Sequence, residues 1–180
     1  MASIAAGIRP DRVTRLALVE ALGPHSMRDS DFPTRMAAYL SEKTKLPGKR
    51  LPVYPDAAAA ARVRAEAGDL SLSAAQTLVA RGLKPAPGGV TWRSDPRLRL
   101  PSPFRMTEGE VLAVLEKIRC PSLLVVARDR PLPDRDLMAK RVSALTGLAV
   151  HEVAGGHHVH LDTPEVVAGF VGDFLGAPLS

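Results

Sequence analysis

The chain has 180 residues, of which 46% are hydrophobic, and this is enough for one domain with a buried core. Its net charge is +5, but the lysines and arginines are spread among acidic residues and only 4% of residues are aromatic, so we expect no nucleic acid partner. The single cysteine, Cys120, excludes a disulfide framework, and the lack of an apolar run of ~18 residues or a signal-peptide pattern predicts a cytoplasmic protein with no membrane partner.

The first residues are typical of a helix end followed by a strand. Residues 1–8 resemble the second half of a helix, because no helix-start signal precedes them. Residues 14–20 form an apolar run of strand length, and Gly23 and Pro24 stop it. We therefore expect a strand of a sheet close to the start of the sequence.

Residues 23–106 are predicted to be mostly helical. Asp56 and Ser73 are the expected N-caps of two of the helices. Pro96 argues against a long strand in the only extended segment. The expected elements are helices over residues 29–46, 57–67 and 74–82 and an extended segment over residues 90–94.

Residues 107–180 alternate helices with apolar strands. Thr107 and Glu110 match a capping box at the start of a helix. The run 123–127 is continuously apolar, as expected of a strand buried on both faces. A helix over 134–145, a strand over 148–153 and a helix over 164–175 follow. Strands separated by helices predict a parallel sheet.

The stretch from Gly155 to Glu165 reads G-G-H-H-V-H-L-D-T-P-E and joins the last expected strand to the last helix. It resembles the G-H-x-x-H-[LM]-[DE]-x-P-E signature of α/β-hydrolases, in which the first histidine is the general base. That resemblance assigns the base to His157; the alternative is an ordinary loop histidine. A base is needed because a serine hydroxyl must lose its proton to become a nucleophile.

The segment 82–98, with its Trp-Arg-Ser-Asp-Pro-Arg-Leu string, resembles the cap of serine hydrolase-like proteins. The resemblance covers essentially the whole chain. It implies a truncated α/β-hydrolase fold, with a short parallel sheet and a mostly helical cap insertion. Residues 1–22 and 107–180 would form the hydrolase core, and residues 23–106 would form the cap.

No serine of the chain stands in the G-x-S-x-G frame of the family's nucleophile elbow. The resemblance begins just past the expected elbow, as a late start codon or a lost gene half would produce. It implies hydrolysis of an ester or related bond by a Ser-acid-His mechanism, here without the nucleophile half and inactive alone. A small-molecule substrate would bind once an N-terminal half completes the site. The alternative is a non-catalytic binding or interaction module, and strand 14–20, left at an open edge, would then favour self-association.

The acid partner of His157 has more than one candidate. The family places an aspartate after the penultimate strand, but Arg130 stands at the usual position and Asp129 comes one residue early. Asp129 is the first candidate, although a shift of one residue at a strand end reverses the side-chain direction. Glu20 is the alternative, since some relatives place the acid after the earlier strand. Asp134 is a weaker candidate, because it is expected to cap a helix instead.

Substrate contacts are expected from large side chains of the predicted cap. Trp92, Phe104 and Met106 are the candidates for a substrate pocket, and the alternative is that they form the cap's own small core. His158 and His160 lie beside His157, but three histidines so close together lack the helical H-x-x-x-H spacing of a metalloprotease. We expect no metal and no cofactor.

Overall fold

The computed structural model describes residues 1–129 and 135–176. Contacts within the chain divide it into two units. Residues 1–29 and 105–180 form the first, which we call the core unit, and residues 30–104 form the second, which we call the cap unit. The sequence places the corresponding boundaries a few residues away, after residues 22 and 106.

The core unit is built on a three-stranded parallel sheet in the order β1-β5-β6. The central strand is buried at every residue, which confirms the prediction from its continuous apolar run. Val19, Val125 and His151 lie side by side across the sheet, so the carboxyl ends of the strands meet at one edge. The strands are β1 (Leu16–Val19), β5 (Ser122–Ala127) and β6 (Leu148–Val153).

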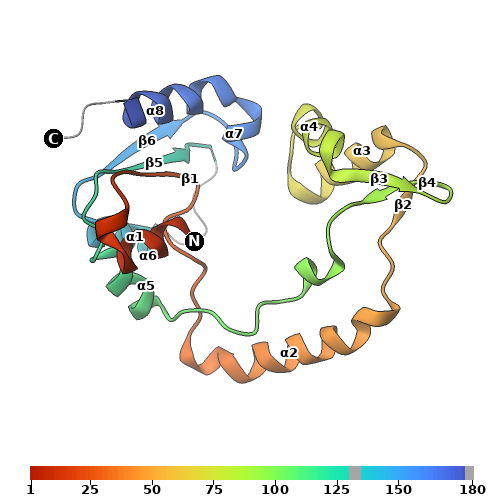
Figure 1. Ribbon diagram of the computed structural model, residues 1–180, viewed down its shortest axis with the longest axis horizontal. Helices are drawn as coiled ribbons and strands as arrows, with labels where there is room; N and C mark the ends of the chain where they lie inside the picture. The colour runs from red at the N-terminus through yellow and green to blue at the C-terminus, as the bar shows by residue number, and fades with distance from the viewer. Residues whose placement is uncertain (130–134, 177–180) are drawn as a thin grey trace. The chain divides into compact units, whose positions relative to one another are not determined.

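Helices cover both faces of this sheet (Figure 1). Side chains of β5 alternate between the two faces: Leu124 packs in the cluster that contains residues of α1 and α5, and Leu123 packs in the cluster that contains residues of α8. Gly7 permits the close approach of α1 to α5, because a Cβ atom at this position would collide with the Val114 carbonyl oxygen. The helices are α1 (Ala2–Ile8), α5 (Glu108–Leu115), α6 (Arg135–Ala144), α7 (Val159–Asp162) and α8 (Pro164–Gly176).

Local capping signals explain where several helices begin. The Thr107 hydroxyl accepts from the Glu110 backbone N–H while the Glu110 carboxylate accepts from the Thr107 N–H, which confirms the capping box. Asp56 caps its helix as predicted, by accepting from the Ala59 N–H. The predicted N-cap of the next helix, Ser73, was wrong.

That helix begins earlier because Ser71 has the extended backbone of an N-cap and its hydroxyl accepts from the Ala74 N–H. Ser73 lies inside the first turn. The helices of the cap unit are α2 (Phe32–Lys45), α3 (Ala57–Gly68) and α4 (Leu72–Gly82). None of the described helices is long and apolar enough to cross a membrane.

The cap unit also contains a three-stranded antiparallel sheet in the order β2-β4-β3, of which the sequence predicted only the middle strand. Strand β3 was not predicted because its segment contains prolines: Pro85 lies inside it, and Pro87 follows it in the hairpin turn with Gly88. A proline is tolerated there because β3 is an edge strand. The strands are β2 (Val53–Tyr54), β3 (Leu83–Ala86) and β4 (Gly89–Trp92).

Candidate functional site

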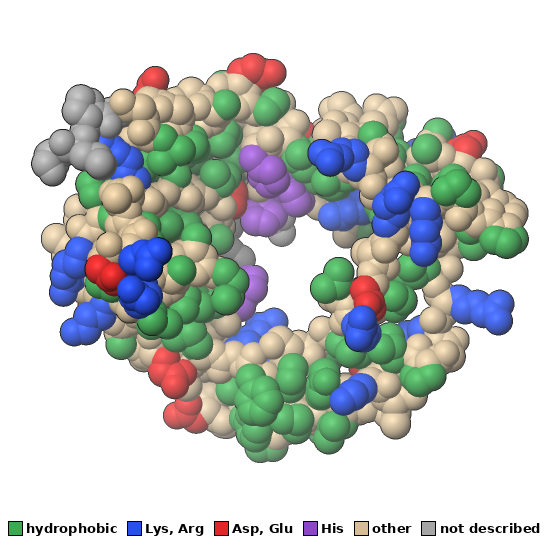
Figure 2. All heavy atoms as spheres, viewed as in Figure 1, with side chains coloured by type: hydrophobic (Ala, Val, Ile, Leu, Met, Phe, Trp, Pro, Cys, Tyr) green, Lys and Arg blue, Asp and Glu red, His purple; other side chains and the backbone are tan. Residues whose placement is uncertain are grey.

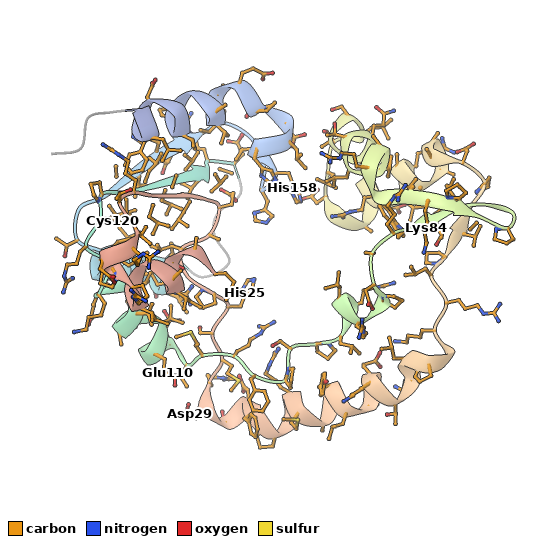
Figure 3. The ribbon with its side chains drawn as sticks, viewed as in Figure 1. His25, Asp29, Lys84, Glu110, Cys120 and His158 are labelled. Carbon is orange, nitrogen blue, oxygen red and sulfur yellow. The ribbon has the colours of Figure 1, made fainter. Side chains whose placement is uncertain are left out.

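His157 lies in the loop that follows β6 and precedes the single turn of α7. Gly155 opens this loop with a φ of +125°, a conformation that side-chain-bearing residues rarely adopt. Figure 2 shows histidine side chains gathered on this part of the core unit, and Figure 3 locates the neighbouring His158 at the start of α7. The loop thus presents an imidazole at the carboxyl edge of the sheet, where ligands of open α/β sheets bind.

Glu20 is the carboxylate that the structure pairs with His157. It directly follows β1, and its N–H continues the strand ladder by donating to the Val125 carbonyl at 2.8 Å. One carboxylate oxygen, Oε2, lies 2.8 Å from His157 Nδ1. The other, Oε1, accepts the Ala127 backbone N–H. Glu20 is therefore fixed at two points, by β5 and by the histidine loop.

The environment of this pair determines how the imidazole is oriented. Only 6% of the Glu20 side chain is exposed, whereas 47% of the His157 side chain is exposed. An ionised carboxylate can only accept hydrogen bonds, so the Nδ1 atom of His157 must donate. The Nε2 atom then remains as an acceptor, and no described residue hydrogen-bonds to it.

Glu20 adopts a φ of +58°, which is uncommon for a residue with a side chain. Such conformations persist where the surroundings fix them, and they concentrate at functional sites. Here the fixing contacts are the two hydrogen bonds of the carboxylate and the ladder bond of the backbone. The turn directs the Glu20 side chain toward the histidine loop.

Asp129, the first acid candidate from the sequence, hydrogen-bonds to Gly155 and not to His157. Its carboxylate accepts the Gly155 N–H at 2.8 Å, and its own N–H donates to the Gly155 carbonyl at 3.3 Å. These two bonds join the loops that follow β5 and β6, so Asp129 shapes the base of the histidine loop. Asp134 lies outside the described residues.

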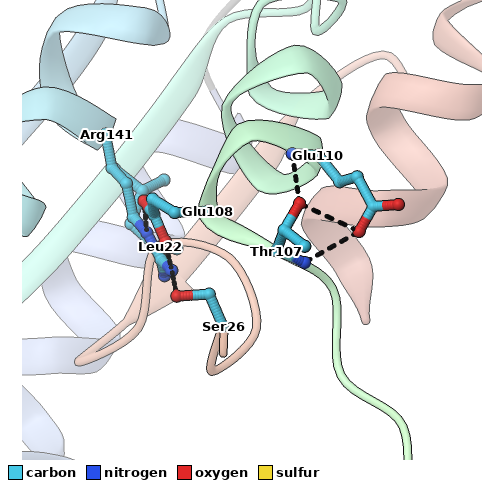
Figure 4. Close-up of polar contacts among 6 residues, drawn as sticks. All are labelled: Leu22, Ser26, Thr107, Glu108, Glu110 and Arg141. Carbon is cyan, nitrogen blue, oxygen red and sulfur yellow. Dashed lines mark hydrogen bonds and ion pairs between the residues drawn. The ribbon is translucent and has the colours of Figure 1, made fainter. Parts of the chain in front are cut away.

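A buried arginine, which no sequence motif singles out, holds the turn that follows Glu20 (Figure 4). Arg141 donates from Nε and Nη2 to the two carboxylate oxygens of Glu108 at 2.8 and 2.6 Å. Its Nη1 donates to the Leu22 carbonyl at 2.8 Å, and Nη2 lies 3.3 Å from the Ser26 hydroxyl. These hydrogen bonds tie the turn to α5 and α6.

The same contacts change the pKa of the Glu108 carboxyl. The hydrogen bonds from Arg141 lower the pKa of the Glu108 carboxyl below its usual value, and a hydrogen bond from Ser26 acts in the same direction. Only 5% of the Arg141 side chain is exposed to solvent, and its buried positive charge is balanced by the Glu108 carboxylate.

The substrate-pocket candidates fall in separate units. Trp92 packs edge-on against Tyr54 in the cap unit, with ring centroids 6.4 Å apart and an interplanar angle of 84°. Phe104 lies 5.6 Å from the ring of Phe32 and is 66% exposed. Met106 packs against the core unit. Trp92 and Phe104 therefore belong to the cap unit and Met106 to the core unit, and their role in a substrate pocket stays a prediction.

The histidine cluster forms ring contacts. The rings of His157 and His158 are 5.0 Å apart, and those of His158 and His160 are 6.0 Å apart. Within residues 1–129 and 135–176, no group of three or more histidine, cysteine, aspartate or glutamate residues is placed to hold a metal ion.

Comparisons with known proteins identify the fold. No protein-family model matches the chain. A serine hydrolase-like protein of Danio rerio is 26% identical over 97% of the chain, which spans 57% of that protein. A hypothetical protein from Pseudomonas aeruginosa PAO1 is 35% identical with a TM-score of 0.89, covering 97% of this chain and 63% of that one.

A thioesterase domain from the curacin biosynthetic pathway is 25% identical with a TM-score of 0.76, covering 98% of this chain and 62% of that one. The fold is therefore that of an α/β-hydrolase, as the sequence predicted. The chain is a relative of serine hydrolase-like proteins, and it spans less than two thirds of each of these relatives.

Proposed function

We propose that the chain supplies the acid and the base of a serine hydrolase site, with His157 as the general base and Glu20 as the acid that orients it. The observation that carries the proposal is the 2.8 Å contact between Glu20 Oε2 and His157 Nδ1 at the carboxyl edge of the sheet. A buried carboxylate on one ring nitrogen, with the other nitrogen left to accept, is the arrangement that nucleophilic catalysis by serine requires.

The chemistry follows from this geometry. His157 Nε2 takes the proton of a serine hydroxyl as the oxygen attacks the carbonyl of an ester or related bond, and it then returns the proton to the leaving group. In the second half, the same nitrogen takes a proton from the water that attacks the acyl-serine carbonyl, and it passes this proton to the serine oxygen as the carbon–oxygen bond breaks and the acid product leaves. Glu20 stays ionised throughout and stabilises the imidazolium.

The serine must come from outside the residues of this sequence, because none of its serines stands in a G-x-S-x-G frame. The open side of β1 is where we expect it. In the described sheet β1 pairs only with β5, and α1 leads into β1. A strand ahead of α1 would reach that side by a right-handed crossover, with its carboxyl end near Glu20 and His157.

The proposal is tested by fluorophosphonate labelling of the chain with and without its upstream coding sequence. We expect the extended form to label at a single serine and the 180-residue form not to label. His157→Ala should abolish labelling and Glu20→Gln should slow it by about 10²–10⁴-fold. Asp129→Asn is the matched control, since it also removes one carboxylate charge of the site region.

Two outcomes would overturn the proposal. Labelling of the short form would show that a nucleophile is present in it after all. An upstream sequence that lacks the elbow would favour the second candidate, a non-catalytic interaction module. The open side of β1 supports that candidate too, because a second copy could pair there, and light scattering of the purified chain would then show a dimer.

A further inference from the structure

The antiparallel sheet of the cap unit has two chemically different faces. Tyr54 and Trp92 share one face, where the Trp92 indole N–H lies 3.4 Å from the Tyr54 hydroxyl. Thr91 belongs to the other face, because side chains alternate along a strand. Val53 and Lys84 lie directly opposite Thr91 on the two neighbouring strands, so they share that second face.

A cavity of about 520 Å³ opens on this second face. Three cationic side chains line it, and they come from three parts of the cap unit: Arg50 ahead of β2, Lys84 in β3 and Arg93 after β4. Figure 3 locates Lys84 on β3, and Figure 2 shows lysine and arginine side chains gathered over this sheet. Three cationic residues thus line one open hollow with the volume of a small molecule.

The three cations are not neutralised by the rest of the cap unit. Among the described residues, the side chains of Arg50 and Lys84 have no hydrogen-bond or ion-pair partner. Arg93 donates from Nε to the Leu83 carbonyl at 2.5 Å, which fixes the guanidinium and leaves its terminal nitrogens available.

The cavity has a single acidic residue, Asp95, and this carboxylate is already paired. Arg97 donates to it from Nε at 2.9 and 3.0 Å, and the Arg97 backbone N–H donates at 2.8 Å. The hydrogen bonds from the Arg97 side chain lower the pKa of Asp95 to about 2. Asp95 therefore stays ionised and compensated by Arg97, so the lining keeps its excess of positive charge.

We propose that this cavity binds the phosphate group of an organic phosphate. A doubly charged phosphate matches several converging cations better than a carboxylate does, and arginine suits its tetrahedral oxygens. The organic part of the ligand would lie on the apolar lining residues Leu51, Val53 and Pro96. The site would give the cap unit a ligand specificity of its own, independent of the Glu20–His157 pair.

The test is an NMR titration of the full chain with phenyl phosphate, with phenol and benzoate as comparison ligands. We expect the backbone amides of Val53, Thr91 and Arg93 to shift with phenyl phosphate, more weakly with benzoate and not with phenol. Affinity should fall as salt is added, because exposed charges are screened.

Charge-removing variants test which residues hold the phosphate. Lys84→Gln should weaken phenyl phosphate binding about threefold, and Lys84→Gln combined with Arg93→Gln about tenfold, in keeping with partly exposed ionic contacts. Lys49→Gln is the matched control, because this substitution also removes one positive charge, next to Arg50 in the sequence. Lys49 is paired with Glu42 and does not line the cavity.

The proposal is overturned if phenol shifts the same amides as phenyl phosphate, or if the double variant binds as tightly as the unmodified chain. An equal loss in the Lys49→Gln control would also overturn it, since that result would reflect overall charge alone. These readouts come from the cap unit, so their failure leaves the hydrolase proposal untouched.

Discussion

Glu20→Gln is the change that most sharply probes the acid–base pair, because it preserves the size of the side chain and removes its charge. The glutamine oxygen can still accept the Ala127 N–H, which is buried and costly to leave unpaired. The amide NH₂ then faces His157 Nδ1, where the carboxylate used to accept. His157 must respond by accepting at Nδ1, which moves its proton to Nε2 and removes the acceptor that a serine would need.

The expected cost follows from the same contacts. Both hydrogen bonds of the Glu20 carboxylate, to His157 and to the Ala127 N–H, become neutral, and a charge-assisted bond is worth about 1 kcal/mol more than a neutral one. We therefore expect the free energy of unfolding of the core unit to fall by about 2 kcal/mol. Glu20→Ala should cost more, because the Ala127 N–H would lose its partner.

Long-range proton–nitrogen NMR measures the tautomer directly, at a pH at which the imidazoles are neutral. We expect the Nδ1–H form of His157 in the unmodified chain and the Nε2–H form in Glu20→Gln. Asp129→Asn should leave the tautomer unchanged, since Asp129 bonds to Gly155 instead. If Asp129→Asn changes the tautomer and Glu20→Gln does not, the assignment of the acid is refuted.

Three further predictions concern the scaffold. Gly7→Ala should lower the free energy of unfolding of the core unit, measured in urea, by about 1–3 kcal/mol, because the added Cβ collides with a carbonyl of α5. Gly109→Ala is the control: its Cβ meets nothing within 4 Å, so this change should be neutral or stabilising. Because the pKa of Glu108 is lowered, its bond to Arg141 contributes stability that is present above pH 4.5 and lost as the pH falls further. Glu108→Gln should flatten that part of the curve of unfolding free energy against pH, and an unchanged curve would contradict this role of Glu108. Asp56→Ala should cost about 1 kcal/mol by removing the N-cap of α3, visible as lower helix content on heating, and no loss would refute the cap.

Local signals in the sequence were sufficient for much of the fold. The apolar run of β5 predicted its burial, and the Thr107 capping box and Asp56 N-cap predicted where two helices begin. These features depend on residues within a few positions of one another. The cap sheet was underestimated, because Pro85 argues against a strand unless the strand lies at an edge.

The pairing within the site depended on tertiary structure. His157 was identifiable from its motif, but its partner Glu20 is separated from it by 137 residues. Only the parallel register of β1, β5 and β6 brings the ends of their strands together. The sequence offered one hint, a glutamate directly after an apolar strand, and gave no sign of the positive φ that turns its side chain toward the histidine loop.

The central claim is that Glu20 acts through His157 on a serine carried by a preceding strand. A double-mutant cycle on ester hydrolysis by the extended chain tests it most directly, using Glu20→Gln, His157→Ala and the two combined. We predict that Glu20→Gln slows hydrolysis in the unmodified background and has no further effect once His157 is alanine. Additive losses from the two changes would contradict the account.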